Sequence, residues 1–131
     1  MNSQSRPTIL IVEDDSFLKD TYSLKLEQEG FTVTSVSDGP TALTIATSEH
    51  PDLIILDLLL PTMDGIQVLK RLRGDQDTRS IPVIIASNVD RADAAKHGDV
   101  SLAQDYLVKS KTSITALVDA CRRCIRAHPA V

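Results

Sequence analysis

Residues 51–65 read PDLIILDLLLPTMDG, a short apolar run that ends in a carboxylate. The run Leu53–Leu56 is rich in branched side chains and lies between two prolines, a pattern typical of a strand buried on both faces. Asp57 follows directly, and an ionised carboxylate at the end of a buried strand is costly unless solvent or a cation compensates it. Asp64 and Gln67 then have the spacing of a helix capping box. Taken alone, the segment also admits Asp57 as a loop aspartate without a special role.

The composition is that of an ordinary globular protein. A chain of 131 residues, 42% apolar and 24% charged, suits a single domain, expected to span residues 1–131 with a core at about 8–127. The formal net charge of -4 and the lack of a dense Lys/Arg cluster argue against direct nucleic-acid binding. No apolar run is long enough to cross a bilayer, and the N-terminus lacks the hydrophobic stretch of a signal peptide. We therefore expect a cytoplasmic protein without membrane contact.

Strand and helix patterns alternate along the chain. Strands are predicted at residues 8–12, 31–36, 53–56, 81–86 and 104–108, and helices at residues 16–29, 39–48, 64–73, 91–97 and 112–127. This alternation predicts an α/β fold: a five-stranded parallel sheet of order 2-1-3-4-5, flavodoxin-like and doubly wound, with five helices. Residues 90–99 contain no large apolar side chain, so the fourth helix is predicted to be short or frayed.

Charged and hydroxyl residues stand at the ends of four of these strands. They are Glu13, Asp14 and Asp15 after the first, Asp57 after the third, Ser87 after the fourth and Lys109 after the fifth. In a parallel sheet the carboxyl ends of the strands meet at one edge, where ligands bind. Converging carboxylates repel one another unless a cation is present, and carboxylates with room for water and phosphate oxygens suit Mg²⁺. Aspartate can form an aspartyl phosphate, so the pattern predicts Asp57 as the nucleophile of a phosphoryl transfer. Each residue alone has an ordinary interpretation, such as a solvated helix start for the acidic triplet.

Four motifs give the chain a resemblance to a known family. ILIVEDD, LDLLLPTMDG, PVIIAS and DYLVK, within about residues 8–127, resemble the receiver domain of two-component response regulators, most closely in length the single-domain chemotaxis regulators. The resemblance implies that Asp57 accepts a phosphoryl group from a histidine kinase or phosphotransfer protein. It implies that Asp14, Asp57 and the backbone carbonyl of Leu59 bind Mg²⁺, with Glu13 acting through water.

The same resemblance implies a switch. Ser87 and Lys109 would contact the phosphoryl group, and Tyr106 would turn inward once Ser87 shifts. The fourth helix, fifth strand and fifth helix would then present a binding surface to a downstream protein. Such a chain is a phosphorelay signalling protein rather than an enzyme, and at most catalyses its own phosphorylation and dephosphorylation.

Several residues depart from the family pattern. Ser110 follows the lysine where proline is usual, so a trans peptide bond is predicted there. Asn88 stands where a small residue is common, and Leu102 where glycine is common. Leu59 and Val89 occupy positions where polar side chains help to place an attacking water, so slow autodephosphorylation is predicted. These departures bear on the switch geometry and the lifetime of the phosphoryl group more than on its formation.

Three other classes compete with this interpretation. A pseudo-receiver would bind partners without being phosphorylated, although the full set of strand-end residues argues against it. A haloacid-dehalogenase-type phosphohydrolase needs a second aspartate at position 59, where leucine stands. A nucleotide-binding Rossmann domain would need a Gly-rich phosphate loop, and none is present.

Cysteines and histidines offer no second site. Cys121 and Cys124 have CxxC spacing but lie on the apolar stripe of the last predicted helix, which favours core packing. His50, His97 and His128 are scattered and are predicted to lie at the surface.

Overall fold

A computed structural model of this chain describes residues 6–127. The strands are β1 (Thr8–Val12), β2 (Thr32–Val36), β3 (Leu53–Leu56), β4 (Val83–Ser87) and β5 (Asp105–Val108). The helices are α1 (Ser16–Gln28), α2 (Gly39–Glu49), α3 (Gly65–Gly74), α4 (Arg91–Ala95) and α5 (Ile114–Ala127), with two 3₁₀ helices, η1 (Val100–Leu102) and η2 (Lys109–Lys111). All pairings are parallel and the strand order is β2-β1-β3-β4-β5, which confirms the predicted fold.

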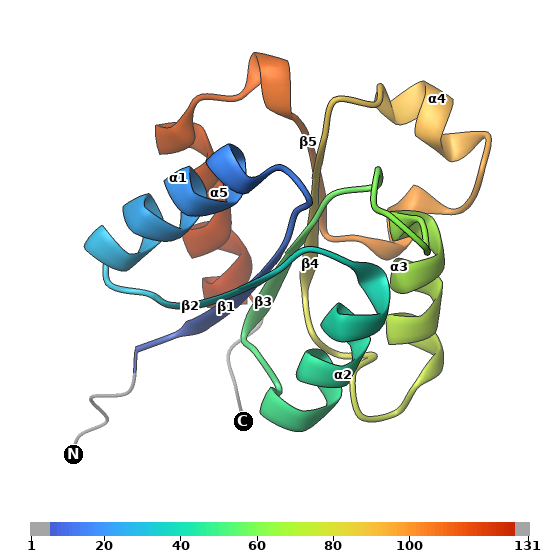
Figure 1. Cartoon of the computed structure of the whole chain (residues 1–131), viewed down its shortest axis with the longest axis horizontal. Coiled ribbons are helices and arrows are strands. Elements are labelled where there is room, and N and C mark those ends of the chain that lie inside the picture. Colours follow the sequence, from blue (N-terminus) through green and yellow to red (C-terminus); the bar gives the residue numbers. More distant parts are fainter. Residues whose placement is uncertain (1–5, 128–131) are drawn as a thin grey trace.

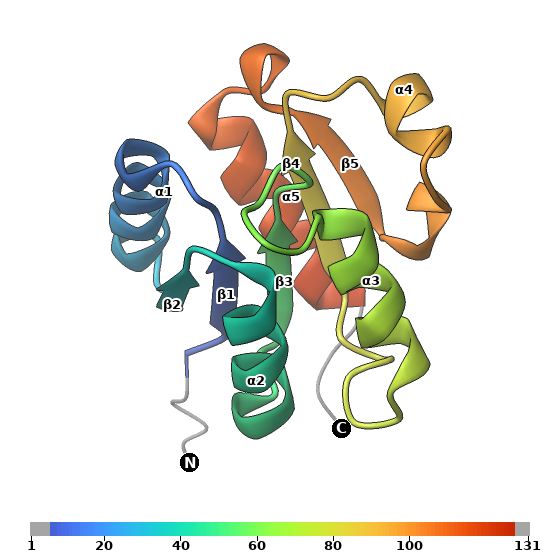
Figure 2. The ribbon, with the colours of Figure 1, turned by 45° about the vertical axis from the view of Figure 1, so that its right-hand side comes forward.

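The sheet lies between two helical layers (Figures 1 and 2). Helices α1 and α5 cover one face, and α2 and α3 cover the other. The three central strands read TILIV, LIIL and VIIAS because both of their faces are buried. Strand β5 is at an edge, and all four of its residues are half-buried. The carboxyl ends of the strands meet at the upper edge of Figure 2, where the connections to the helices begin.

Aspartates at the helix starts set the direction of the chain as it leaves the sheet. Each of the first four helices begins after an aspartate whose side chain accepts a backbone N–H of the first turn; these N-caps are Asp15, Asp38, Asp64 and Asp90. Such caps satisfy N–H groups that have no partner inside the helix. Helix α3 begins at Gly65 rather than Asp64, and the predicted cap is present, since Asp64 Oδ1 accepts the N–H of Gln67 at 2.9 Å.

The element boundaries agree with prediction to within two residues, and two of the differences have clear reasons. Strand β4 begins at Val83 rather than residue 81, since Pro82 lacks the N–H that a ladder needs. Helix α5 begins at Ile114 rather than residue 112, because η2 comes first. Helix α4 ends at Ala95, so the prediction of a short fourth helix is confirmed.

The segment after α4 packs on α3 and the core through Gly98 and the apolar side chains of Val100 and Leu102. A methyl group at Gly98 would lie 2.4 Å from Cγ2 of Ile66 on α3, so the backbone here packs directly on that helix. Val100 is buried, and Leu102 packs against the same core. This gives Leu102 a packing role where the family often has glycine.

The cysteines lie in the core between α1, α5 and the sheet. Burial raises the pKa of the Cys121 thiol to about 12, and it also raises that of Cys124. His50 and His97 are exposed as predicted, while His128 lies outside the described residues. No helix within residues 6–127 is both long and apolar enough to cross a membrane.

Candidate phosphoryl-acceptor site

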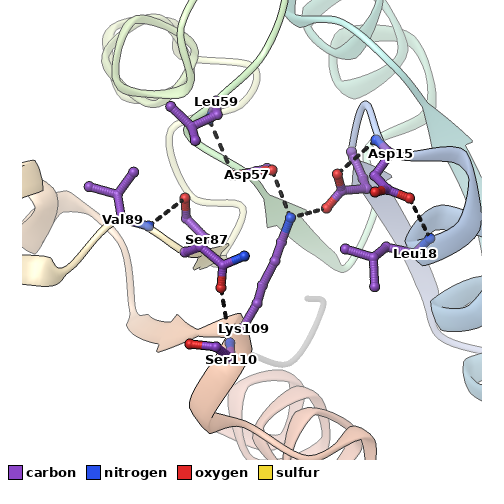
Figure 3. Close-up of polar contacts among 10 residues, drawn as sticks. Asp15, Leu18, Asp57, Leu59, Ser87, Val89, Lys109 and Ser110 are labelled. Carbon is purple, nitrogen blue, oxygen red and sulfur yellow. Dashed lines mark hydrogen bonds and ion pairs between the residues drawn. The ribbon is translucent and has the colours of Figure 1, made fainter.

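Lys109, which follows the edge strand β5, lies between two carboxylates. Lys109 Nζ donates a hydrogen bond to Asp57 Oδ2 at 2.7 Å and another to Glu13 Oε1 (Figure 3). The three side chains are only 9%, 8% and 4% exposed for Lys109, Asp57 and Glu13. The strand order explains the meeting, because β1 and β3 are neighbours in the sheet and β5 is two strands away from β3.

The two carboxylate partners of Lys109 stabilise its charged form. Burial alone would lower the pKa of its ammonium, but hydrogen bonds to Asp57 and Glu13 more than offset this, and the pKa is raised. The lysine therefore stays a cation across the physiological range, and each buried carboxylate has a charged donor.

The other two acidic residues after β1 differ, because Asp15 makes hydrogen bonds within the fold and the carboxylate of Asp14 makes none within the described residues. The backbone N–H of Asp15 donates to Glu13 Oε2 at 2.9 Å, and the Asp15 carboxylate caps α1 through the N–H of Leu18 at 3.0 Å. Asp14 is exposed, and its carboxylate makes no hydrogen bond or ion pair with any other part of residues 6–127. Asp57 Oδ1 accepts the N–H of Leu59 at 3.2 Å, which orients the acceptor carboxylate.

The donor chemistry of this edge fits Mg²⁺. Glu13 and Asp57 share one cation, Lys109, and Asp14 follows Glu13 directly in the chain; Mg²⁺ prefers such carboxylate oxygen ligands. Within the described residues, no group of three or more His, Cys, Asp or Glu side chains is arranged to hold a metal ion by itself. A magnesium ion here would complete its shell with backbone carbonyl oxygen and water, as Mg²⁺ commonly does.

Ser87 and Tyr106 are joined through one backbone segment. Ser87 is fully buried at the end of β4, and its Oγ accepts the N–H of Val89 at 3.4 Å. The Tyr106 hydroxyl donates to the carbonyl of the same Val89 at 2.5 Å. Burial, followed by the charges of Asp90 and Asp57, raises the pKa of Tyr106, so its hydroxyl remains a donor.

The two departures nearest the site contact each other. Residues 6–127 contain no cis peptide bond, so the bond between Lys109 and Ser110 is trans as predicted. The N–H that proline would lack is donated by Ser110 to Asn88 Oδ1 at 3.0 Å. This hydrogen bond was not predicted, because Asn88 and Ser110 are 22 residues apart in the sequence.

Gly65 is a second residue that the sequence reasoning missed. A methyl group there would lie 2.3 Å from the carbonyl oxygen of Asp57 and 2.6 Å from Cα of Leu58. The first turn of α3 therefore packs directly on the backbone of the acceptor residue. Glycine inside a first helical turn, where it costs helix stability, was the available signal.

Comparison with known proteins finds relatives for most of this chain. A family model described as the response regulator receiver domain matches residues 9–122. The chain belongs to the receiver domain family. This receiver domain is 41% identical, over 103 residues, to the DNA-binding dual master transcriptional regulator RpaA of Synechocystis sp.; the match covers 79% of this chain and 43% of that protein. It is 39% identical over 101 residues to the response regulator PleD of Caulobacter vibrioides, covering 77% of this chain and 22% of that protein. It thus spans less than half the length of either relative.

Solved structures show the same fold. The receiver domain of Francisella response regulator 1452 superposes with a TM-score of 0.82 at 31% identity, over 92% of this chain and 98% of that one. The receiver domain of a histidine kinase from Syntrophus aciditrophicus gives a TM-score of 0.85 at 30% identity, over 95% and 94%. Receiver domains similar to this one therefore occur in both response regulators and kinases.

Proposed function

We propose that this receiver domain is the phosphoacceptor of a two-component phosphorelay, with Asp57 as the accepting residue. The observation that carries the proposal is the buried Asp57 carboxylate, hydrogen-bonded by the Lys109 ammonium and oriented by the N–H of Leu59. An Asp57 oxygen would attack the phosphorus of a phosphohistidine on a histidine kinase or phosphotransfer protein. The new bond is O–P, the broken bond is the donor's N–P bond, and the leaving imidazole takes a proton from solvent.

Each neighbouring residue has a role in this proposal. Asp14, Asp57 and the Leu59 carbonyl would hold Mg²⁺, with Glu13 bound through water. The ion would supply positive charge between the acceptor carboxylate and the incoming phosphoryl group. Lys109 would hold a phosphoryl oxygen by its charge, and the buried Ser87 hydroxyl would donate to another.

The output step of the proposal uses the segment that joins Ser87 to Tyr106. A Ser87 hydroxyl drawn toward the phosphoryl group would pull on Val89, whose carbonyl accepts the Tyr106 hydroxyl. The surface formed by α4, β5 and α5 would then change its affinity for a downstream protein. We propose no direct contact of this chain with nucleic acid; the DNA binding named for RpaA belongs to a protein of which this chain covers 43%.

One observation favours a second candidate, a pseudo-receiver that binds its partner without phosphorylation. Lys109 already pairs with both Glu13 and Asp57, so each of these buried carboxylates has a charged donor without a metal ion. If that pairing never opens, neither Mg²⁺ nor a phosphoryl group can enter.

Intact mass after incubation with acetyl phosphate and Mg²⁺ separates the two candidates. We expect the wild-type chain to gain one phosphoryl group. We expect no gain in Asp57→Asn, or in wild-type protein treated with a chelator. A folded wild-type chain that gains nothing would refute the phosphoacceptor proposal and leave the pseudo-receiver.

A further inference from the structure

The hydrogen bond between Asn88 and Ser110 connects the two segments that follow Ser87 and Lys109, the side chains proposed to contact the phosphoryl group. Asn88 follows Ser87, the last residue of β4, and Ser110 follows Lys109, the first residue of η2. The parallel ladder between these strands ends at the pair Ser87 and Val108. The side chain of Asn88 extends the connection one step beyond the sheet by accepting the Ser110 N–H at 3.0 Å.

This bond satisfies a requirement of η2 (Lys109–Lys111). The first N–H groups of any helix lack partners within it, and a polar side chain at the N-cap usually accepts one of them. Val108 stands at the N-cap of η2 and makes no side-chain cap bond. The amide oxygen of Asn88, from the neighbouring loop, accepts one of those N–H groups instead.

We propose that Asn88 is a positioning residue for phosphoryl transfer, acting through Lys109. The inference rests on the proposed phosphoacceptor function. Lys109 is the first residue of η2, and its side chain extends from that backbone to Asp57. The hydrogen bond from the Ser110 N–H to Asn88 holds the backbone next to Lys109 and so fixes the position from which its side chain extends. Since misplacing a group by about 1 Å can slow an oriented reaction many-fold, a bond at the base of Lys109 bears on the rate.

The side chain of Asn88 could also contact the phosphoryl group directly, and the experiment must distinguish this role from the positioning of Lys109. With Oδ1 engaged by Ser110, the amide nitrogen of Asn88 makes no hydrogen bond to any group within residues 6–127 and is a donor beside the site. If Asn88 acted directly on the phosphoryl group, its removal would slow transfer whether or not Lys109 is present.

The experiment measures the rate constant for phosphorylation by acetyl phosphate with Mg²⁺. We expect Asn88→Ala to slow it three- to ten-fold, equivalent to about 0.7–1.4 kcal/mol. In a Lys109→Met background, followed over longer times, Asn88→Ala should have no further effect. The matched control is Asp99→Ala, which removes the same kind of side-chain cap, Asp99 Oδ1 to the Ser101 N–H at 3.0 Å, from the other three-residue helix η1. It should change the rate less than two-fold.

A spectroscopic measurement follows Lys109 without any phosphoryl chemistry. The side-chain ammonium signal of Lys109 in ¹⁵N NMR should shift or broaden in Asn88→Ala. It should be preserved in Asn88→Asp, which keeps an acceptor for Ser110, and in Asp99→Ala.

The outcomes distinguish this inference from the function on which it rests. No adduct on the wild-type chain would overturn the proposed function and this inference with it. A wild-type adduct with an unchanged rate in Asn88→Ala, or with an equal loss in both Lys109 backgrounds, would overturn the positioning role alone. An unchanged Lys109 signal in Asn88→Ala would overturn it as well.

Discussion

Lys109→Met should destabilise the fold more than the loss of any surface ion pair. The substitution keeps the apolar stem of the side chain and removes only the charge. Glu13 and Asp57 would then be buried carboxylates, 4% and 8% exposed, without their shared cation. Removing one partner of a buried ion pair costs about 3–5 kcal/mol, because the remaining charge is left uncompensated. Water at this rim can reach part of the site, so we expect about 3 kcal/mol at pH 7 in the absence of Mg²⁺.

Equilibrium urea unfolding measures this difference. With a dependence of about 2 kcal/mol per molar urea, the midpoint should fall by about 1.5 M. Lys96→Met is the matched control, because Lys96 pairs with Asp93 at 3.4 Å with both side chains mostly exposed, and such pairs contribute about 0–1 kcal/mol. Adding Asp57→Asn to Lys109→Met should recover part of the loss, since one unpaired charge is then absent. Equal midpoints for Lys109→Met and Lys96→Met would refute the reasoning.

The pH dependence of this difference has a defined sign. The folded-state pKa of Lys109 is raised, so its contribution is fully present below the ordinary lysine value and is lost only as the pH rises through the raised value. The gap between wild type and Lys109→Met should therefore persist at pH 9, below the ordinary lysine pKa of about 10.4, and close only as the pH rises through the raised pKa of Lys109.

Other predictions concern lifetime, packing, reactivity and local stability. Leu59, 63% exposed beside the acceptor, and half-buried Val89 have hydrocarbon side chains that cannot hydrogen-bond a water, so the phosphoryl group should be lost slowly. Leu59→Asn with Val89→Glu should speed its hydrolysis about ten-fold, followed by intact mass. Gly65→Ala should lower the free energy of unfolding by about 1–3 kcal/mol because its methyl group meets backbone, whereas Gly74→Ala, with nothing within 4 Å, should be neutral or stabilising. Cys121, with a pKa of about 12, should resist iodoacetamide at about pH 8 until the protein is unfolded. Backbone amides of α4 should exchange faster than those of β3, and equal protection would contradict the weak packing inferred for that helix.

The fold could be predicted because its signals are local. Uninterrupted apolar runs at β1, β3 and β4 require burial on both faces, and that requirement leaves few arrangements other than a doubly wound parallel sheet. The meeting of Glu13, Asp57 and Lys109 followed from the same topology, since strand ends share one edge.

The contacts that were missed depend on side-chain and backbone approaches that no pattern encodes. Asn88 and Ser110 were each recognised as departures, but their hydrogen bond depends on the register of β4 against β5. Gly65 follows the predicted cap Asp64, and only the packing of α3 shows that its missing side chain admits the backbone of Asp57. The start of β4 was misplaced because the effect of Pro82 on the ladder was not considered.

The ion pairs of Lys109 suggest why the acceptor site and its surroundings would respond together under the proposed function. Glu13 accepts from Lys109 through one oxygen and from the N–H of Asp15 through the other, and Asp15 in turn caps α1. A phosphoryl group on Asp57 would add negative charge beside Lys109 and compete with Glu13 for it. A Glu13 carboxylate freed in this way would turn to Mg²⁺ or its waters while still holding the backbone at the start of α1. The same event would thus bear on α1 through Glu13, on the loop after β4 through Ser87, and on η2 through Lys109. Under the proposed function, one charge change at Asp57 would therefore bear on three of the segments that leave the carboxyl ends of the strands.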